Sequence, residues 1–233
     1  LTGKKPQPRY AMLADFLAED RQPIDQGLLL YFPAPASYTD EDMLEVVTMV
    51  YGGLVNKNVV AMLQANGINA LGLTGADMDV IRSHKRPVRN GLDYGYAGDV
   101  DHVNGFELRN IIEQGITPVM APLTHDGCGN ILNTNADTIA AETAKALSRF
   151  YEVTLIYSFE KKGVLRNPDD DDSVIPVLTR DDFNKYVAGG TIAGGMIPKL
   201  HNALAAVDEG VKQVIITLSN AIDGKHGTII KQC

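Results

Sequence analysis

Apolar residues along this chain follow two alternating patterns, a helical period of three to four residues and short continuous runs typical of buried strands. The longest helical pattern begins after Thr39-Asp40-Glu41-Asp42, which has the order of a capping box, and Gly67 is expected to stop it. Its apolar positions are Met43, Leu44, Val46, Val47, Val50, Tyr51, Leu54, Val55, Val59, Met62 and Leu63. They occupy more than one stripe, so a single sheet would leave part of them uncovered. We therefore expect residues 39–66 to form a helix that also contacts a second subunit.

The rest of the chain alternates between strand and helix patterns. Strands are expected at about 68–73, 117–122, 153–158, 211–218 and 228–231. Helices are expected at about 106–115, from 137 onward, at 180–188 and at 195–209. Loops are expected at 82–86, which is rich in basic residues, and at 123–130, with a glycine-rich hairpin at 94–103. Helices between successive strands imply crossover connections, so the pattern predicts an α/β fold with a mostly parallel sheet.

Composition and charge narrow the class of protein. The 233 residues carry a formal charge of −8 and a pI of about 5.1, which argues against a nucleic-acid partner and against an anionic membrane surface. The sequence has no continuous run of about 18 apolar residues and no signal-peptide pattern, so neither a membrane span nor secretion is expected. Cys128 and Cys233 form no spacing pattern. We expect free thiols and a cytoplasmic protein.

Two polar motifs open predicted helices. Asn133-Thr134-Asn135-Ala136-Asp137 brings an amide and a carboxylate, four residues apart, to the start of one helix. Gly194-Gly195-Met196-Ile197-Pro198-Lys199 brings a lysine to the start of another. Carboxylate, amide, lysine and helix N-termini together favour a phosphoryl donor with a small acidic acceptor. Taken singly, each motif is more simply explained by an aspartate cap or a solvated lysine.

Other polar clusters carry plainer explanations. His125-Asp126-Gly127-Cys128 has no second ligand pair at a spacing suited to a metal, so it is interpreted as a loop turn and no metal site is expected. The acidic run at 169–172 is interpreted as a solvated loop. Neither a cysteine nor a serine lies in a motif with a paired histidine, which argues against nucleophilic catalysis.

Five motifs occur in the order that is found in one known family. They are Gly72-Leu73-Thr74-Gly75-Ala76-Asp77, Gly95-Tyr96-Ala97-Gly98-Asp99-Val100, Pro118-Val119-Met120-Ala121-Pro122, and the two helix-opening motifs described above. This ordered set resembles the amino acid kinase family, and within it the members that phosphorylate an acylated glutamate. The resemblance extends from about Thr39 to the C-terminus.

The resemblance implies a three-layer αβα sandwich with a central, mostly parallel sheet. It divides one continuous domain into an N-terminal lobe, residues 1–150, for the acyl amino acid and for dimerisation, and a C-terminal lobe, residues 151–233, for ATP. The reaction implied is transfer of the γ-phosphoryl group of ATP to the side-chain carboxylate of N-acetyl-L-glutamate. Mg²⁺ is expected to arrive on the nucleotide phosphates. A homodimer through the 39–66 helix fits the same pattern.

The resemblance also implies roles for individual residues. Asn133 and Gly75 correspond to substrate-binding positions. Asp137 corresponds to the aspartate that orients the catalytic lysines, and Lys199 to the lysine that stabilises charge on the phosphates. In the nucleotide half, Phe159-Glu160-Lys161-Lys162-Gly163-Val164 replaces the usual Thr-Asp-Val-x-Gly-Val, so Glu160 and Gly163 are candidate nucleotide contacts.

The N-terminal segment departs from the family pattern. It lacks the Lys-x-Gly-Gly strand, and the second strand at Gly27–Tyr31 continues into Phe32-Pro33-Ala34-Pro35 instead of a Gly-Gly-Gly loop. Ser37 stands where a substrate-binding arginine is expected. Either residues 1–38 have diverged and turnover is lost, or this stretch does not represent the native lobe, through joined fragments, missing residues or a misread stretch. We favour the second explanation, because residues 39–233 retain Asn133, Asp137 and Lys199.

Two alternatives to the implied function stay open at this point. The acceptor could be another acylated acidic amino acid, such as N-succinylglutamate or N-acetylaminoadipate, since part of the acyl pocket belongs to the N-terminal lobe. The chain could also be a non-catalytic, nucleotide-binding regulatory paralogue. The departures before Thr39 favour a paralogue, whereas the retained Asp137 and Lys199 argue against it.

Overall fold

The computed structural model describes the backbone of residues 9–12 and 27–30 and the full residues 38–232. Residues 1–8, 13–26, 31–37 and 233 lie outside the described part. Three of the N-terminal features named above therefore fall outside it: the start of the chain, the Phe32-Pro33-Ala34-Pro35 segment and Ser37. The same is true of Cys233.

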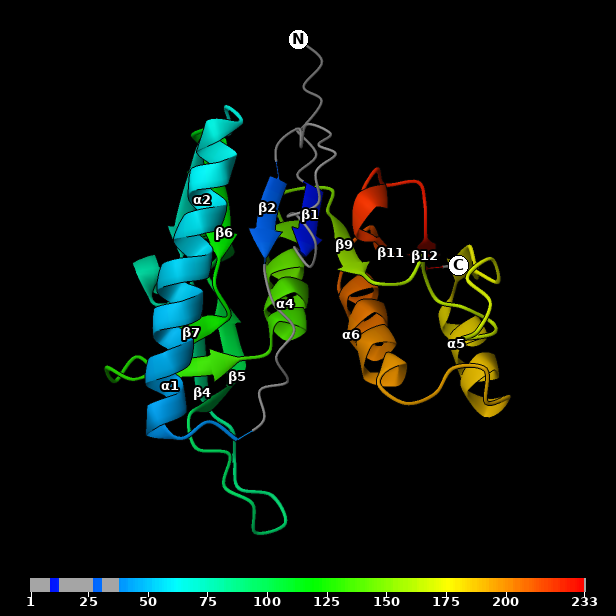
Figure 1. The fold of residues 1–233 in the computed structure, drawn as a ribbon, viewed down its shortest axis with the longest axis horizontal. Coiled ribbons are helices and arrows are strands. Elements are labelled where there is room, and N and C mark those ends of the chain that lie inside the picture. The colour runs from blue at the N-terminus through cyan, green and yellow to red at the C-terminus, as the bar shows by residue number, and fades with distance from the viewer. Residues whose placement is uncertain (1–8, 13–26, 31–37, 233) are drawn as a thin grey trace.

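A single large sheet forms the centre of the fold (Figure 1). In spatial order its strands are β10 (Val177–Leu178), β12 (Thr228–Ile230), β11 (Gln213–Leu218), β9 (Thr154–Phe159), β1 (Arg9–Met12), β2 (Gly27–Leu30), β6 (Thr117–Met120) and β3 (Ala70–Leu73). Among these described strands, every neighbouring pair is parallel except β11 and β12. The predicted α/β fold with a mostly parallel sheet is confirmed.

Helices α3 (Gly105–Glu113), α4 (Ala136–Ser148), α5 (Arg180–Ala188) and α6 (Met196–Asp208) lie where the apolar period predicted helices. The core is built largely from α4, α6 and the central strands. Ile139, Ala140, Ala144 and Leu147, predicted to face inward from α4, are all buried. Helix α4 packs on β9 and on α6, and α6 packs on β11. This packing holds the starts of α4 and α6 close to the ends of the central strands β9 and β11.

A second, four-stranded sheet closes on itself in the order β4 (Ile81–Lys85), β5 (Ala97–Val103), β8 (Ile131–Thr134) and β7 (Leu123–His125). The prediction of a loop at 82–86 was wrong, because β4 occupies most of it, whereas the loop predicted at 123–130 is observed from residue 126 onward and only its first three residues form β7. In β4 the buried positions alternate with charged ones, and the outward His84 pairs with Asp101 of β5. Because the solvated face of this short strand carries charged side chains, the alternation of buried and exposed positions was not recognised in the sequence.

The 39–66 segment forms the expected long helix, as α1 (Glu41–Val47), a π-helical segment (Thr48–Val55) and α2 (Asn56–Ala65). Gly67 ends it, as predicted, with a positive φ of 75°. The predicted capping box was shifted by one residue, since the cap is Asp40, whose carboxylate accepts a hydrogen bond from Met43 N at 2.8 Å. Thr39 is instead buried, with its backbone bonded to Tyr94 and Tyr96.

The long helix has one buried and one exposed apolar face. Val59 and Leu63 pack against Ala70 and Val119 of the sheet. Exposed apolar side chains on the other face are Met43, Val46, Met49, Val50 and Leu54. By length and mean hydropathy (1.4) Glu41–Ala65 meets the criterion for a membrane span, with 22% of its most apolar window buried. The helix therefore presents a large apolar face that the described chain leaves uncovered.

A buried hydrogen bond attaches α2 to the sheet, and it generates a stability prediction. The Asn56 amide donates to the Val119 carbonyl oxygen at 2.8 Å. Replacing Asn56 with alanine should lower the free energy of unfolding by about 1–3 kcal/mol, because a buried carbonyl loses its donor. Denaturant unfolding measures the change.

Asn58 on the same helix is exposed and provides a matched control. Asn58→Ala should be neutral or stabilising by up to about 0.7 kcal/mol, because alanine has the higher helix propensity. Equal losses in the two variants would contradict a role for the Asn56 bond.

Candidate functional site

Asp137 lies in the first turn of α4 but does not cap the helix. The cap is Asn135, whose side-chain oxygen accepts a hydrogen bond from Thr138 N at 3.0 Å. The Asp137 side chain is only 16% exposed, and its Oδ1 is buried with no hydrogen-bond partner among the described residues. A buried carboxylate with an unused oxygen is unfavourable for folding alone and is typical of functional sites. The simpler explanation of Asp137 as a helix cap is therefore wrong.

Lys199 lies in the first turns of α6 and reaches Asp137. Its Nζ is 3.8 Å from Asp137 Oδ2, and its side chain is 30% exposed. Among the described residues no side chain caps the start of α6, where Gly194 has a positive φ of 58° and Gly195 has open space around it. One first-turn N–H is bonded within the turn and Pro198 has none, so it is mainly the positive dipole end of this helix that suits an anion. The lysine is thus not a fully solvated surface residue, and it brings the second helix-opening motif to the carboxylate of the first.

Burial and the neighbouring lysine act on Asp137 in opposite directions. Burial raises the pKa of its carboxyl group, and the positive charge of Lys199 lowers it. The effect of burial is the larger one, so the net pKa is raised. At neutral pH the ionised carboxylate consequently destabilises the fold, while it offers a full negative charge to the lysine.

Two aromatic residues of β9 complete this cluster, and the sequence analysis did not single them out. Phe159, at the end of β9, has its ring centroid 3.6 Å from Lys199 Nζ. Tyr157 is buried and donates a hydrogen bond from its hydroxyl to the Asp137 carbonyl oxygen at 3.0 Å. The available signal was the period of two, which places both rings on one face of the strand.

Of the predicted substrate residues, Asn133 lies in the closed sheet and Gly75 in the connection between β3 and β4. Asn133, on β8, is buried, and its amide donates to the Thr39 hydroxyl at 3.1 Å. Gly75 follows β3, and a Cβ there would lie 2.7 Å from the Ile81 carbonyl oxygen and 3.0 Å from Thr124 Cα. Glycine is therefore required at this turn by backbone packing alone. Within the described part of the chain, no hydrogen bond or ion pair joins Asn133 or Gly75 to the Lys199–Asp137 pair.

The predicted nucleotide contacts follow β9. Glu160 is exposed directly after the strand, adjacent to Phe159 in the chain. Gly163 is buried, and a Cβ would lie 2.8 Å from Thr228 Oγ1. That hydroxyl accepts a hydrogen bond from Val164 N at 2.8 Å, which fixes the turn against β12. Glycine at 163 thus keeps the loop close to the sheet edge at which Lys199 lies.

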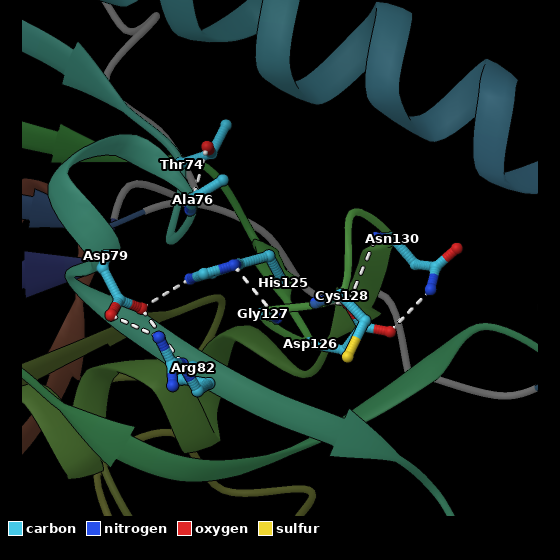
Figure 2. Close-up of polar contacts among 9 residues, drawn as sticks. All are labelled: Thr74, Ala76, Asp79, Arg82, His125, Asp126, Gly127, Cys128 and Asn130. Carbon is cyan, nitrogen blue, oxygen red and sulfur yellow. Dashed lines mark hydrogen bonds and ion pairs between the residues drawn. The ribbon is translucent and has the colours of Figure 1, made fainter.

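The His125–Cys128 segment is a hydrogen-bonded turn (Figure 2). His125 Nε2 lies 2.7 Å from Asp79 Oδ1, and its Nδ1 accepts from Gly127 N at 3.2 Å. Asp126 accepts from the side chain and backbone of Asn130 and from Cys128 N, which hold the pKa of its carboxyl group at about 2. The interpretation as a turn agrees with these contacts, and Cys128 is an exposed free thiol.

Neither a metal cluster nor the open groove identifies a different site. Within the described residues no group of three His, Cys, Asp or Glu side chains is arranged to hold a metal ion. A groove of about 420 Å³ is lined by Glu41, Leu44, Glu45, Thr48, Met49, Tyr96, Gly129, Asn130 and Ile131. It contains none of the predicted site residues and borders the exposed face of the long helix. The buried charge of Asp137 is the stronger indicator of function.

Comparisons with known proteins agree with the geometry. The model of the "Amino acid kinase family" matches residues 9–218. An "Acetylglutamate kinase" of Phocaeicola vulgatus is 66% identical over 194 residues, which cover 83% of this chain and 75% of that protein. The acetylglutamate kinase of Bacteroides thetaiotaomicron is 65% identical over the same shares. A solved structure from Streptococcus mutans UA159 superposes with a TM-score of 0.72 at 27% identity, covering 88% of this chain and 86% of that one.

The raised pKa of Asp137 gives a prediction with a defined sign. The carboxyl group of Asp137 binds its proton more tightly in the native state than in the unfolded state. Its unfavourable contribution to the free energy of unfolding is therefore absent below the unfolded pKa of 3.8, and it grows as the pH rises through the native pKa. Asp137→Asn should therefore raise Tm at pH 7, by about 2–4 °C for each kcal/mol regained in a domain of this size. The gain should shrink toward pH 4.

Thermal unfolding at the two pH values measures this difference. Asp169→Asn, in an exposed loop, removes the same charge from the surface and serves as the control. A lower Tm for Asp137→Asn at pH 7 would show that the ion pair with Lys199 outweighs the cost of burial.

Proposed function

This chain belongs to the amino acid kinase family, and from that premise we propose that it transfers the γ-phosphoryl group of ATP to the side-chain carboxylate of N-acetyl-L-glutamate. The product is N-acetyl-L-glutamyl 5-phosphate, an intermediate of arginine biosynthesis. The observation that carries the proposal is the Lys199–Asp137 pair at the starts of two helices. The high identity to acetylglutamate kinases supports the choice of acceptor.

Phosphoryl transfer requires positioning and positive charge more than covalent catalysis. Lys199 supplies a point charge for the phosphate oxygens, and the start of α6 adds the positive end of the helix dipole beside it. Asp137 holds the lysine from the α4 side without being phosphorylated itself. The packing of α4 on α6 keeps the two groups together.

The remaining predicted site residues are proposed to contact the two substrates beside the Lys199–Asp137 pair. We assign Asn133 and Gly75 to the acyl-amino-acid side, and Glu160 and Gly163 to the nucleotide side. Mg²⁺ would reach the site on the nucleotide phosphates, because it seldom uses a cage made only of protein groups. The unused Oδ1 of Asp137 and the open start of α6 fit a ligand that carries phosphate and metal together. When bound, the ion would neutralise part of the phosphate charge.

The large sheet supports one continuous domain with two lobes. We place residues 1–150 in the acyl-amino-acid lobe and residues 151–233 in the ATP lobe of a three-layer αβα sandwich. Strand β9 of the second lobe pairs with β1 and β11, so the sheet passes through both lobes without interruption. The protein is proposed to act in the cytoplasm.

The exposed apolar face of the long helix is assigned to a second copy of the chain. Membrane insertion is the competing assignment, since the helix meets the length and hydropathy criterion. Asn56, Val59 and Leu63 attach the helix to the sheet on its other side, which favours a helix that stays with its domain. A homodimer would bury Met49, Val50 and Leu54, which are exposed in the single chain.

Coupled ADP release with MgATP and N-acetyl-L-glutamate tests the activity. Lys199→Ala should lower kcat by roughly 10²–10³-fold, because transition-state charge loses a preorganised partner. Lys212→Ala removes a lysine that pairs with Glu152 at the start of β11 and should leave kcat unchanged. N-succinyl-L-glutamate, run in parallel, tests the acyl group.

Turnover that Lys199→Ala does not reduce would contradict the assigned role of this lysine. Nucleotide binding without turnover on either acceptor would overturn the proposed reaction. Faster turnover with the succinyl substrate would correct the acceptor and leave the kinase assignment intact.

Sedimentation velocity tests the dimer. Leu54→Asp places a charge on the exposed helix face and should convert a dimer into a monomer, because burying an unpaired charge is strongly unfavourable. Leu92→Asp, at a similarly exposed leucine outside the helix, should leave the dimer intact. A wild-type monomer, or a Leu54→Asp dimer as stable as the wild type, would contradict the assignment of this face.

A further inference from the structure

The ammonium group of Lys199 contacts an aromatic ring more closely than it contacts its carboxylate. Nζ lies 3.6 Å from the centroid of the Phe159 ring and 3.8 Å from Asp137 Oδ2. A cation over the face of an aromatic ring is attracted by the ring quadrupole. The ring and the carboxylate come from two different elements, β9 and α4, and both lie at the start of α6.

The ring of Phe159 is itself held in place. It stacks on Tyr157, with centroids 6.2 Å apart and planes at 27°. The Tyr157 hydroxyl in turn donates to the Asp137 carbonyl oxygen at 3.0 Å. Strand β9 therefore fixes both partners of Lys199, one through the Phe159 ring and one through the backbone of α4. Figure 1 shows the end of β9 close to α4 and α6.

We propose that Phe159 is a positioning residue for Lys199 in the phosphoryl transfer proposed above, on which this inference rests. A lysine side chain has four rotatable bonds and loses much rotamer freedom when it is held in one geometry. The ring face selects the conformers that keep the ammonium beside Asp137 and over the site. The 3.8 Å separation from Asp137 Oδ2 is an ion pair and not a hydrogen bond, so the N–H donors of the ammonium remain for phosphate oxygens.

A purely structural role for Phe159 makes a different prediction. The side chain is half-buried, so an aliphatic residue of similar size could fill its volume. Leucine or methionine would keep the apolar contact with Tyr157 but would offer no quadrupole to the ammonium. Tyrosine would keep the ring face. The contrast between these substitutions therefore separates packing from positioning.

Steady-state kinetics on the full chain with MgATP and N-acetyl-L-glutamate tests the proposal. Phe159→Leu should lower kcat and kcat/KM together by roughly 3- to 30-fold, because the ring acts through Lys199, whose interaction with the phosphoryl group strengthens in the transition state. Phe159→Tyr should restore most of the lost kcat. Phe159→Met is a second aliphatic variant, used if Phe159→Leu unfolds. Phe150→Leu, which removes a ring beneath Arg109 elsewhere, should leave kcat unchanged.

Lysine-selective NMR provides a readout that does not depend on activity. The ε-methylene protons of Lys199 should be shifted upfield by the ring current in the wild type and in Phe159→Tyr, and this shift should be lost in Phe159→Leu. Lys199→Arg assigns the signal. An unshifted Lys199 signal in the wild type, or a Phe159→Leu variant with wild-type kcat, would overturn the inference. If the wild type turns over neither substrate, the proposed function fails, whereas the NMR contrast still decides whether Phe159 positions Lys199.

Discussion

The desolvated carboxylate of Asp137 is the group on which the arrangement of the site depends. Removing a charge from water is unfavourable unless other charges and dipoles replace the solvent. Here the replacement is partial, since Lys199 approaches one oxygen and the other has no partner among the described residues. Asn135 takes over the capping of α4, so Asp137 is not used for the helix itself. The core formed by α4, α6 and the central strands supplies the stability that this carboxylate removes.

Much of the fold could be predicted from the apolar periods, and the failures have physical causes. Helix α5 was predicted at about 180–188, which are its observed ends, and in the structure a Thr179–Asp182 capping box fixes its start. Strands β4 and β7 of the closed sheet fell in segments predicted as loops, because short strands with one solvated face carry polar side chains such as Arg82 and His84 outward. The cap of the long helix was placed one residue early, because Thr39 uses its backbone to pair with a distant hairpin. Such a tertiary contact leaves no local trace in the sequence.

The residues of the candidate site likewise include some that the sequence could predict and some that it could not. Lys199 and Asp137 could be found from the order of motifs, and their proximity follows from two helices that start at one sheet edge. Phe159 and Tyr157 could not, because aromatic residues at the end of a buried strand are ordinarily core residues. The structure distinguishes these two residues from ordinary core residues, because Lys199 lies over the Phe159 ring and the Tyr157 hydroxyl bonds to the α4 backbone. The structural reason for Gly75 was equally invisible, since it depends on Ile81 and Thr124.

The order of strands in the large sheet has a consequence for how the chain is made. Strands β1 and β2, near the start of the sequence, lie in the middle of the sheet, where Arg9 pairs with Thr154 and Leu29 with Val119. During synthesis the first strands leave the ribosome long before the strands between which they insert. Contacts of such high sequence separation form slowly. The two strands can pair with each other, and β2 with β6 once it has emerged, but the other edge of β1 stays unpaired until β9 is made, a period in which chaperone binding would protect it from aggregation.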